Sequence, residues 1–343
     1  MSEPGRKTIS QLRAEARSGA LVARIHAQIE EIIRKDASNG KPFWEVRFRD
    51  AGDSLILKAW SDSPNFSACE GLARGMAVAI DGEFCVGSFG LDAKRWSVLA
   101  LPENEAQELL RGDETDRAAA QVDFNLILEK INSLADPRLR ALTEAFLAEF
   151  GSRFRRAAAA RRNHHAFRGG LLRHTAQMMR CADALCTAYP ALHRDLLIAG
   201  VLVHDCGKLW EMCPPETSFE IPRDVRGELL GHISIGIEVV NALWRKLPLE
   251  NWKVLTPPSE DVRLHLLHLI AAHHGELQFG SPVEPKTPEA IALHFIDNLD
   301  ARLEMIFASY QRLIEVAPGV FERIRGLNVS PVRALPVSGP PKE

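Results

Sequence analysis

Ionisable residues occur inside apolar stretches in the second half of this 343-residue chain. The stretch LVHDCGKLWEM places His204 beside Asp205 directly after the apolar run DLLIAGV, and Lys208 follows one helical turn after His204. Removing such a pair from water is unfavourable unless a partner compensates the charge. The pair therefore predicts a compensating partner, and a metal ion is the partner that these residue types suit best.

Further histidine and aspartate residues share this setting, within or at the end of an apolar stretch. They are His174 in GGLLRHT, His232 in LLGHIS, His273 and His274 in AAHHGE, and Asp297 in HFIDNLD. With His204 and Asp205 they could meet at the centre of a helical bundle. Imidazole and carboxylate ligands without thiolate suit Mn, Fe, Co, Ni or Zn. A carboxylate such as Asp205 can bridge two metals about 3.5–4 Å apart, the spacing of two-metal phosphoryl chemistry.

The elements that would position these residues are helices, because apolar residues recur at helical spacing from Val122 onward. We expect an all-α domain over residues 122–320, followed by a tail over 321–343 that ends in the disorder-prone string PVSGPPKE. The expected helices are VDFNLILEKINSL, PRLRALTEAFLAEF, GLLRHTAQMMRCADALCTAY, DLLIAGVLVHDCGKLWEM, GHISIGIEVVNALWRKL, VRLHLLHLIAAHHG and PEAIALHFIDNLDARLEMIFASYQRL.

An N-terminal segment of residues 1–19 is followed by residues 20–101, whose sequence pattern predicts a small all-β domain. Alternation in FWEVRF places Trp44, Val46 and Phe48 on one face. Asn39-Gly40 and Asp81-Gly82 are expected turns, and NFSACEGLARG is an expected short helix. Five short strands with a helix between the third and fourth is the order of an OB-fold barrel. The acidic residues 102–121 are an expected linker or linking helix.

An OB-fold barrel often binds single-stranded nucleic acid through aromatic faces. We take Trp44 and Trp60 as candidate substrate-binding residues. The alternative is that such aromatic side chains fill the core of the barrel.

Composition sets limits on the class of protein. The net charge of −3 provides no overall field toward nucleic acid or membrane, and 46% hydrophobic residues is ordinary for a globular protein. No leader-like or membrane-spanning run is present, so we expect a cytoplasmic protein that does not bind membranes. The cysteines lack CxxC spacing and are expected to be reduced: Cys69, Cys85, Cys181, Cys186, Cys206 and Cys213.

The order H…HD…H…HH…D resembles the HD superfamily of metal-dependent phosphohydrolases over about residues 150–310. The strings HHAFRGGLLRHT, LIAGVLVHDCGKLWE, GELLGHISIG, AAHHGELQFGSP and ALHFIDNLDARLEM are similar to those of the YhaM-type 3′–5′ exoribonucleases. That family joins an N-terminal OB-fold to an HD domain, the order inferred above. Cys206 departs from the family pattern, in which an aliphatic residue is commoner.

The resemblance implies two divalent metal ions, with Mn²⁺ as the first candidate and Fe, Co, Ni or Zn as alternatives. By the family pattern, Asp205 is shared by the two ions and has a catalytic role. One ion would also take His174, His204 and Asp297, and the other would also take His232, His273 and His274.

Lys208 could contact the scissile phosphate or the leaving oxygen. The alternative is a structural cation at a helix end, or one that pairs with Glu211. His294 could orient Asp297, and Asp300 could support the site, cap a helix or pair with Arg302.

Residues 150–182 contain eight arginines and no acidic residue, directly before and around His174. We expect part of this run to bind substrate phosphates at the mouth of the active site. The alternative is a solvated helix face with salt bridges to residues 103–116. The candidate substrate-binding residues are Arg161, Arg162, His164 and Arg168, and His165 is a candidate catalytic acid.

The function favoured by these features is 3′–5′ exonuclease action on single-stranded RNA, or on single-stranded DNA, with release of 5′-mononucleotides. An HD hydrolase of small or cyclic nucleotides with a regulatory barrel is the second hypothesis. A non-catalytic nucleic-acid-binding protein is the third. A homo-oligomer that rings several active sites would suit an exonuclease.

Overall fold

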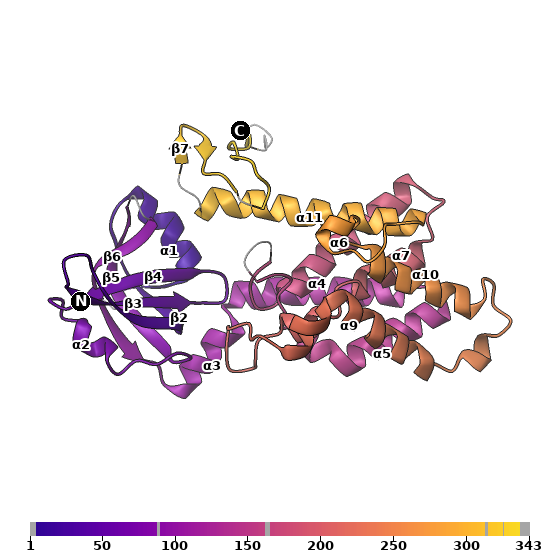
Figure 1. Ribbon diagram of the computed structural model, residues 1–343, viewed down its shortest axis with the longest axis horizontal. Coiled ribbons are helices and arrows are strands. Elements are labelled where there is room, and N and C mark those ends of the chain that lie inside the picture. Colours follow the sequence, from indigo (N-terminus) through magenta and orange to yellow (C-terminus); the bar gives the residue numbers. More distant parts are fainter. Residues whose placement is uncertain (1–4, 88–89, 162–164, 313–314, 325, 337–343) are drawn as a thin grey trace, which may run out of the picture.

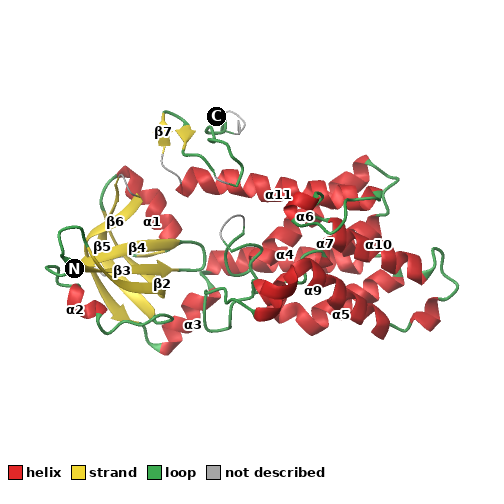
Figure 2. Cartoon of the chain, in the orientation of Figure 1, coloured by secondary structure: helices red, strands yellow, loops and turns green. Residues whose placement is uncertain are grey.

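Strands gather at one end of the molecule and helices at the other (Figures 1 and 2). The computed structural model describes residues 5–336 except 88–89, 162–164, 313–314 and 325. Helix α11 (Pro288–Arg312) runs along one side of the helical part and reaches back toward the strands (Figure 1). There the Arg17 guanidinium donates a hydrogen bond to the carbonyl oxygen of Tyr310 at 3.1 Å, which ties the two ends together.

The N-terminal part is a curved antiparallel sheet. Its strands are β2 (Leu21–Asp36), β3 (Pro42–Arg49), β4 (Ser54–Trp60), β5 (Ala77–Gly87) and β6 (Gly90–Ala100), in the order β4-β3-β2-β5-β6. The short β1 (Arg6–Lys7) pairs with β2 in parallel. Among the described residues, β4 and β6 end the sheet without pairing with each other, so the sheet is barrel-like but not closed.

Alternating side chains fold this sheet around its own core. Val46 and Phe48 on β3 are fully buried, and Trp96 on β6 packs edge-on against Phe48 with 5.9 Å between ring centroids. The helix α2 (Phe66–Cys69) follows the third of the five long strands, as the OB-fold pattern predicted. Helix α1 (Ile9–Glu15) adds Ile9 and Leu12 to the same core.

The predicted turn at Asp81-Gly82 is wrong, because both residues lie inside β5. Asp81 faces Arg24 on β2 and accepts two hydrogen bonds from its guanidinium at 2.8 and 2.9 Å. A side chain on Gly82 would place its Cβ 3.0 Å from the carbonyl oxygen of Arg95. The glycine therefore serves close strand packing rather than a reversal, and the pairing of β5 with β6 continues to Gly87 opposite Gly90.

The acidic stretch over residues 102–121 is helical. Helix α3 (Glu103–Arg111) ends before Gly112, and α4 (Glu114–Asn132) begins with Asp113 as its N-cap. The Asp113 carboxylate accepts a hydrogen bond from the backbone N–H of Asp116 at 2.8 Å. Of the two sequence-based interpretations, the linking helix describes this segment.

The helical part packs around α7 (Arg194–Val203), which is buried from Leu196 to its end. The Nδ1 atom of His193 caps this helix by accepting from the backbone N–H of Leu196 at 3.2 Å. The other helices are α5 (Pro137–Phe154), α6 (Gly170–Ala188), α8 (Lys208–Glu211), α9 (Val225–Lys246) and α10 (Ser259–Ala272). No helix in the described residues is long and apolar enough to cross a membrane.

The chain after α11 folds back on that helix. Strands β7 (Glu315–Ala317) and β8 (Val320–Phe321) form a small hairpin, with Phe321 buried against Tyr310. The Tyr310 hydroxyl donates to the carbonyl oxygen of Val332 at 2.8 Å. Residues 315–324 and 326–336 are therefore attached to the helical part, whereas 337–343, the end of the predicted tail, lie outside the described residues.

Candidate metal centre

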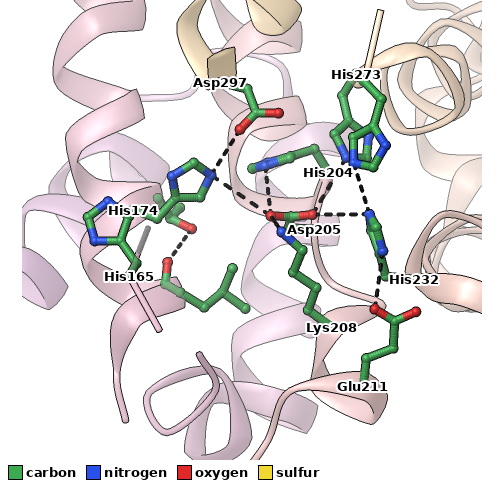
Figure 3. A network of polar contacts seen from close by, with 12 residues as sticks. His165, His174, His204, Asp205, Lys208, Glu211, His232, His273 and Asp297 are labelled. Carbon is green, nitrogen blue, oxygen red and sulfur yellow. Dashed lines mark hydrogen bonds and ion pairs between the residues drawn. The ribbon is translucent and has the colours of Figure 1, made fainter. Parts of the chain in front are cut away.

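The seven predicted ligands meet at one place in the helical part (Figure 3). Buried α7 delivers His204 and Asp205 at its C-terminal end, and α10 delivers His273 and His274 at its own. The rest come from single positions on three helices: His174 on α6, His232 on α9 and Asp297 on α11. The seven residues therefore meet at the centre of a helical bundle, as the prediction of a metal site requires.

Asp205 is the central carboxylate, and its two oxygens face different histidines. Oδ2 lies 3.3 Å from His204 Nε2 and 3.8 Å from His174 Nε2. Oδ1 lies 3.5 Å from His273 Nε2 and 3.6 Å from His232 Nε2. This is the arrangement expected of a carboxylate that bridges two metal ions.

Close approach of α9 to this centre depends on Gly207. A Cβ at Gly207 would lie 1.9 Å from the carbonyl oxygen of His232, so any side chain there would push the histidine away. The glycine that follows the His-Asp pair therefore lets His232 reach Asp205.

All five histidines are anchored through Nδ1. Val201, Ile270 and Phe279 provide carbonyl oxygens 2.9, 2.7 and 2.8 Å from the Nδ1 atoms of His204, His273 and His274. A carboxylate holds each of the other two: Asp300 Oδ2 lies 2.7 Å from His174 Nδ1, and Glu211 Oε2 lies 3.2 Å from His232 Nδ1. Every Nε2 is left to face the centre.

These contacts define the tautomers. Carbonyl and carboxylate oxygens accept hydrogen bonds, so each Nδ1 carries a proton, and each imidazole in its neutral form presents the Nε2 lone pair inward. The Nε2 atoms of His232 and His274 lie 3.3 Å apart, where two lone pairs would repel unless a proton or cation joins them. Such Nδ1 anchoring is the usual outer support of histidines that bind metal.

Buried polar atoms at the centre lack hydrogen-bond partners in the described part of the chain. They include His204 Nε2, His273 Nε2 and Asp205 Oδ1. Buried polar atoms are ordinarily satisfied, so these atoms need a ligand that is not a protein group. The donor set of imidazole nitrogens and carboxylates fits a divalent metal ion.

The pKa values of these groups are shifted by their surroundings. Burial raises the pKa of Asp205, but Lys208 and His204 outweigh it and hold that pKa well below its usual range. Burial lowers the pKa of His273 and of His274. Burial also acts to lower the pKa of His174, yet hydrogen bonds to Asp297 and Asp300 raise it to about 9. Metal binding at His174 therefore has to displace a proton.

Lys208 lies inside the site and pairs with Asp205 rather than with Glu211. Its Nζ donates to Asp205 Oδ2 at 2.6 Å, and the residue is 8% exposed. An ammonium group has three donors, so two N–H bonds remain for other partners. This position is compatible with the predicted contact to a substrate phosphate.

His165 lies behind His174, on the side away from Asp205 (Figure 3). The residue is buried, and its Nε2 is 2.9 Å from Asp300 Oδ2. A catalytic acid has to reach the leaving group, and this location favours a supporting role instead.

The predicted phosphate-binding arginines are occupied by backbone carbonyls. The Arg161 guanidinium donates to the carbonyl oxygens of Glu211, Ile221 and Pro222 at 3.0–3.3 Å. Arg168 donates to those of Pro215, Glu216 and Ser218 at 2.7–3.3 Å. Both arginines thus hold the segment between α8 and α9. The other two candidates, Arg162 and His164, lie outside the described residues.

The two candidate tryptophans lie on opposite faces of the sheet. Trp44 is half-buried on the inner face and packs against Phe66, with 6.4 Å between centroids. Trp60 lies on the outer face against Phe43, with 4.6 Å between centroids, and Lys58 Nζ is 5.5 Å from the Phe43 ring. Trp44 thus has the position of a core residue, whereas Trp60 has that of a stacking surface.

Other histidines near the site have structural partners. His294 Nδ1 lies 2.9 Å from the carbonyl oxygen of His273, so it supports that turn. His268 Nε2 accepts from the backbone N–H of Lys286 at 2.9 Å. From the sequence, Asp300 has several candidate roles, and the contact of Glu211 with His232 is not predicted. The only available signal for Asp300 was its place one turn after Asp297.

Comparison with known proteins agrees with this geometry. Residues 171–302 match the model of the HD domain, and this range contains all seven ligands. A protein of Geobacillus sp. named 3′-5′ exoribonuclease YhaM is 31% identical over 304 residues, covering 88% of this chain and 89% of that protein. Proteins of the same name from Bacillus pumilus and Bacillus licheniformis are 30% and 32% identical, covering 88% and 89% of this chain and 91% and 92% of theirs.

The similarity spans both the barrel-like sheet and the helical part, in the same order along the chain. The protein therefore belongs to the family of the 3′-5′ exoribonuclease YhaM, with a C-terminal HD domain that carries the candidate metal centre.

Proposed function

We propose that this protein is a metal-dependent exoribonuclease that hydrolyses single-stranded RNA from its 3′ end to 5′-mononucleotides. The observation that carries the proposal is the convergence of four inward-facing Nε2 atoms on the carboxylate of Asp205, with the Nε2 atom of His274 beside that of His232. The relatives named as exoribonucleases supply the substrate class and the direction.

Two groups of side chains would hold two divalent metal ions, with Mn²⁺ proposed first and Fe, Co, Ni or Zn as alternatives. Asp205 would contribute one oxygen to each group. His174, His204 and Asp297 would complete the first, and His232, His273 and His274 the second. When bound, such ions supply Lewis acidity toward a phosphodiester and lower the pKa of a coordinated water.

The protein's own residues orient and neutralise the reacting groups. Lys208 holds Asp205 by an ion pair at 2.6 Å and keeps two donors for a non-bridging phosphate oxygen. Asp297 and His232 are the most accessible of the site's ion-paired ligands, with side chains 18% and 15% exposed. Substrate would therefore enter on the side of these two residues, since His174 and His204 are completely buried.

The outer face of β3 and β4 is the proposed strand-binding surface. Trp60 stacks on Phe43 there, and Lys58 adds a positive charge. Aromatic rings beside a cation bind single strands with little dependence on base identity. A single-stranded DNA substrate, a cytoplasmic location and a homo-oligomer stay predictions from the sequence.

The test uses a single-stranded RNA labelled at its 5′ end, incubated with the metal-free protein to which Mn²⁺ is added back. A ladder that shortens from the 3′ end, with 5′-mononucleotides as products, is expected. The Asp205→Ala protein should produce no ladder. Hydrolysis of cyclic or free nucleotides by a protein that leaves every oligonucleotide intact would contradict the proposal and favour a small-nucleotide hydrolase.

A further inference from the structure

His174 and His232 are the two histidines of the centre whose Nδ1 atoms contact carboxylates. His204, His273 and His274 are held by carbonyl oxygens. We propose that Asp300 and Glu211 are positioning residues, each strengthening one metal site: Asp300 the site of His174, and Glu211 the site of His232. The inference rests on the two-metal centre of the proposed function and goes beyond it by assigning each end its own support.

Asp300 joins two histidines through one oxygen atom. Its Oδ2 lies 2.7 Å from His174 Nδ1 and 2.9 Å from His165 Nε2, and the residue is 7% exposed. An ionised carboxylate only accepts, so both rings donate to it.

The backbone around His165 is built to hold that ring in place. His165 adopts a left-handed conformation, with φ of 49°, which is uncommon for a residue other than glycine. Its carbonyl oxygen accepts from the backbone N–H of Ala159 at 3.2 Å. A Cβ at Gly170 would lie 2.0 Å from the same oxygen, so only glycine fits there. Such a conformation persists where surrounding contacts determine it, and here it delivers a second donor to Asp300.

Glu211 has the corresponding positioning role at the site of His232. Its Oε2 lies 3.2 Å from His232 Nδ1, and its side chain is 13% exposed. The start of α9 packs directly on it, because a Cβ at Gly227 would lie 2.8 Å from Glu211 Cγ. Glu211 follows Asp205 by six residues, so one short segment carries both the bridging ligand and the support of His232.

A carboxylate acts differently from a carbonyl on the ring it holds. Its negative charge makes the imidazole a stronger ligand and offsets part of the charge of a bound ion. Loss of such a supporting partner lowers metal affinity by about 10–100-fold in other metal sites. Asp300 contacts His174 and Glu211 contacts His232, and these two histidines lie at opposite ends of the row in Figure 3. Each carboxylate should therefore act mainly on the nearer ion.

The experiment measures metal binding without RNA, on the full-length protein with all metal removed. Mn²⁺ is titrated into wild type, Asp300→Asn and Glu211→Gln, while free Mn²⁺ is followed by electron paramagnetic resonance. Two bound ions are expected for wild type. Each variant should keep one ion at wild-type affinity and bind the other about 10–100-fold more weakly. In each single variant, the signal of the coupled Mn²⁺ pair should be absent at free Mn²⁺ concentrations at which wild type still shows it. The double variant should bind both ions more weakly than wild type.

Asp195→Asn is the matched control. Asp195 is a carboxylate at the far end of α7 and accepts from the backbone N–H groups of Ala135 and Asp136 at 2.7 and 2.8 Å. It should change stability but leave both ions bound as in wild type. Circular dichroism of the metal-free proteins identifies a variant that is unfolded, and Asp300→Glu or Glu211→Asp then replaces it.

The inference would be overturned if Asp300→Asn and Glu211→Gln bound Mn²⁺ with the same titration curve as wild type. It would also be overturned if each single variant lost affinity for both ions equally. Because the titration contains no RNA, its result is independent of the proposed activity. A protein that shows the expected metal loss but cleaves no RNA would support the positioning roles and contradict the proposed function.

Discussion

Lys208 and Asp205 form an almost completely buried ion pair at the middle of the candidate metal centre, with 2.6 Å between Nζ and Oδ2. The same Oδ2 faces His174 and His204. The ammonium therefore lies at the point where the bridging ligand and a substrate phosphate would meet, and this relationship leads to the first prediction.

Replacing Lys208 with Met should lower the kcat for RNA hydrolysis by about 100–1000-fold, since it removes a fixed donor from the reacting phosphate. Mn²⁺ binding should be retained, because the negative charge of Asp205 is no longer shared with the lysine. Single-turnover assays at saturating Mn²⁺, with metal content measured in parallel, check this. Unchanged kcat would mean that Lys208 only balances the charge of Asp205.

Replacing Asp205 with Asn should affect both metal ions together, unlike the end-specific variants above. Its oxygens face histidines of both groups, at 3.3 Å and 3.5 Å for the nearest pairs. Metal affinity should fall at both sites by at least roughly the 100-fold known for supporting residues. Metal analysis after equilibrium dialysis measures this, and retention of one tightly bound ion would argue against a bridging role.

Replacing Trp60 with Ala should weaken RNA binding without disturbing the metal centre. Loss of one base-stacking ring costs about 1–3 kcal/mol, so KM for a long single strand should rise roughly 10-fold. Hydrolysis of bis(p-nitrophenyl) phosphate, which is too small to reach the sheet, should be unchanged. Val22→Ala is the control, because Val22 is an apolar residue on β2 that is 66% exposed. Equal KM values for the two variants would exclude the outer face of β3 and β4 as the strand-binding surface.

A pH-dependent contribution to stability is expected from Asp136, which caps α5 and pairs with Arg138 at 2.7 Å. Burial raises the pKa of Asp136, but hydrogen bonds from Arg138 and the charge of that residue lower it overall. When the pKa of a carboxyl group is lower in the folded protein, its contribution to the free energy of unfolding is complete above the pKa of the unfolded chain, about 3.9. That contribution is lost as the pH falls through the pKa of the folded protein.

Asp136→Asn should therefore lower the free energy of unfolding by about 3 kcal/mol at pH 7, because it leaves the almost fully buried Arg138 without its carboxylate. The difference from wild type should shrink below about pH 4. Urea denaturation of the helical part between pH 7 and pH 3 measures it. Asp62 is an exposed ion-pair partner of Lys41, so Asp62→Asn should leave the free energy of unfolding unchanged at each pH. A difference that stays constant with pH would show that the Asp136 charge is not responsible.

Much of the centre was predictable from the sequence, because a buried metal site requires ionisable residues in apolar surroundings. His204 and Asp205 at the end of an apolar run, and His273 and His274 at the end of another, show that requirement directly. The all-α second half and the presence of strands in the first half follow from periodicity, which is a local property. The turn at Asp81-Gly82 failed because a cross-strand partner, Arg24, outweighed the local preference of the two residues.

The sequence by itself determined which residue types stand at helix ends and how they are spaced. Only the tertiary structure decided which nitrogen of each histidine faces the centre, since the atoms that anchor Nδ1 include Asp300, 126 residues after His174. It likewise decided that Arg161 and Arg168 bind backbone carbonyls rather than an open phosphate site. Hydrogen-bond partners depend on distances between segments remote in the chain, and residue type and spacing contain no record of those distances.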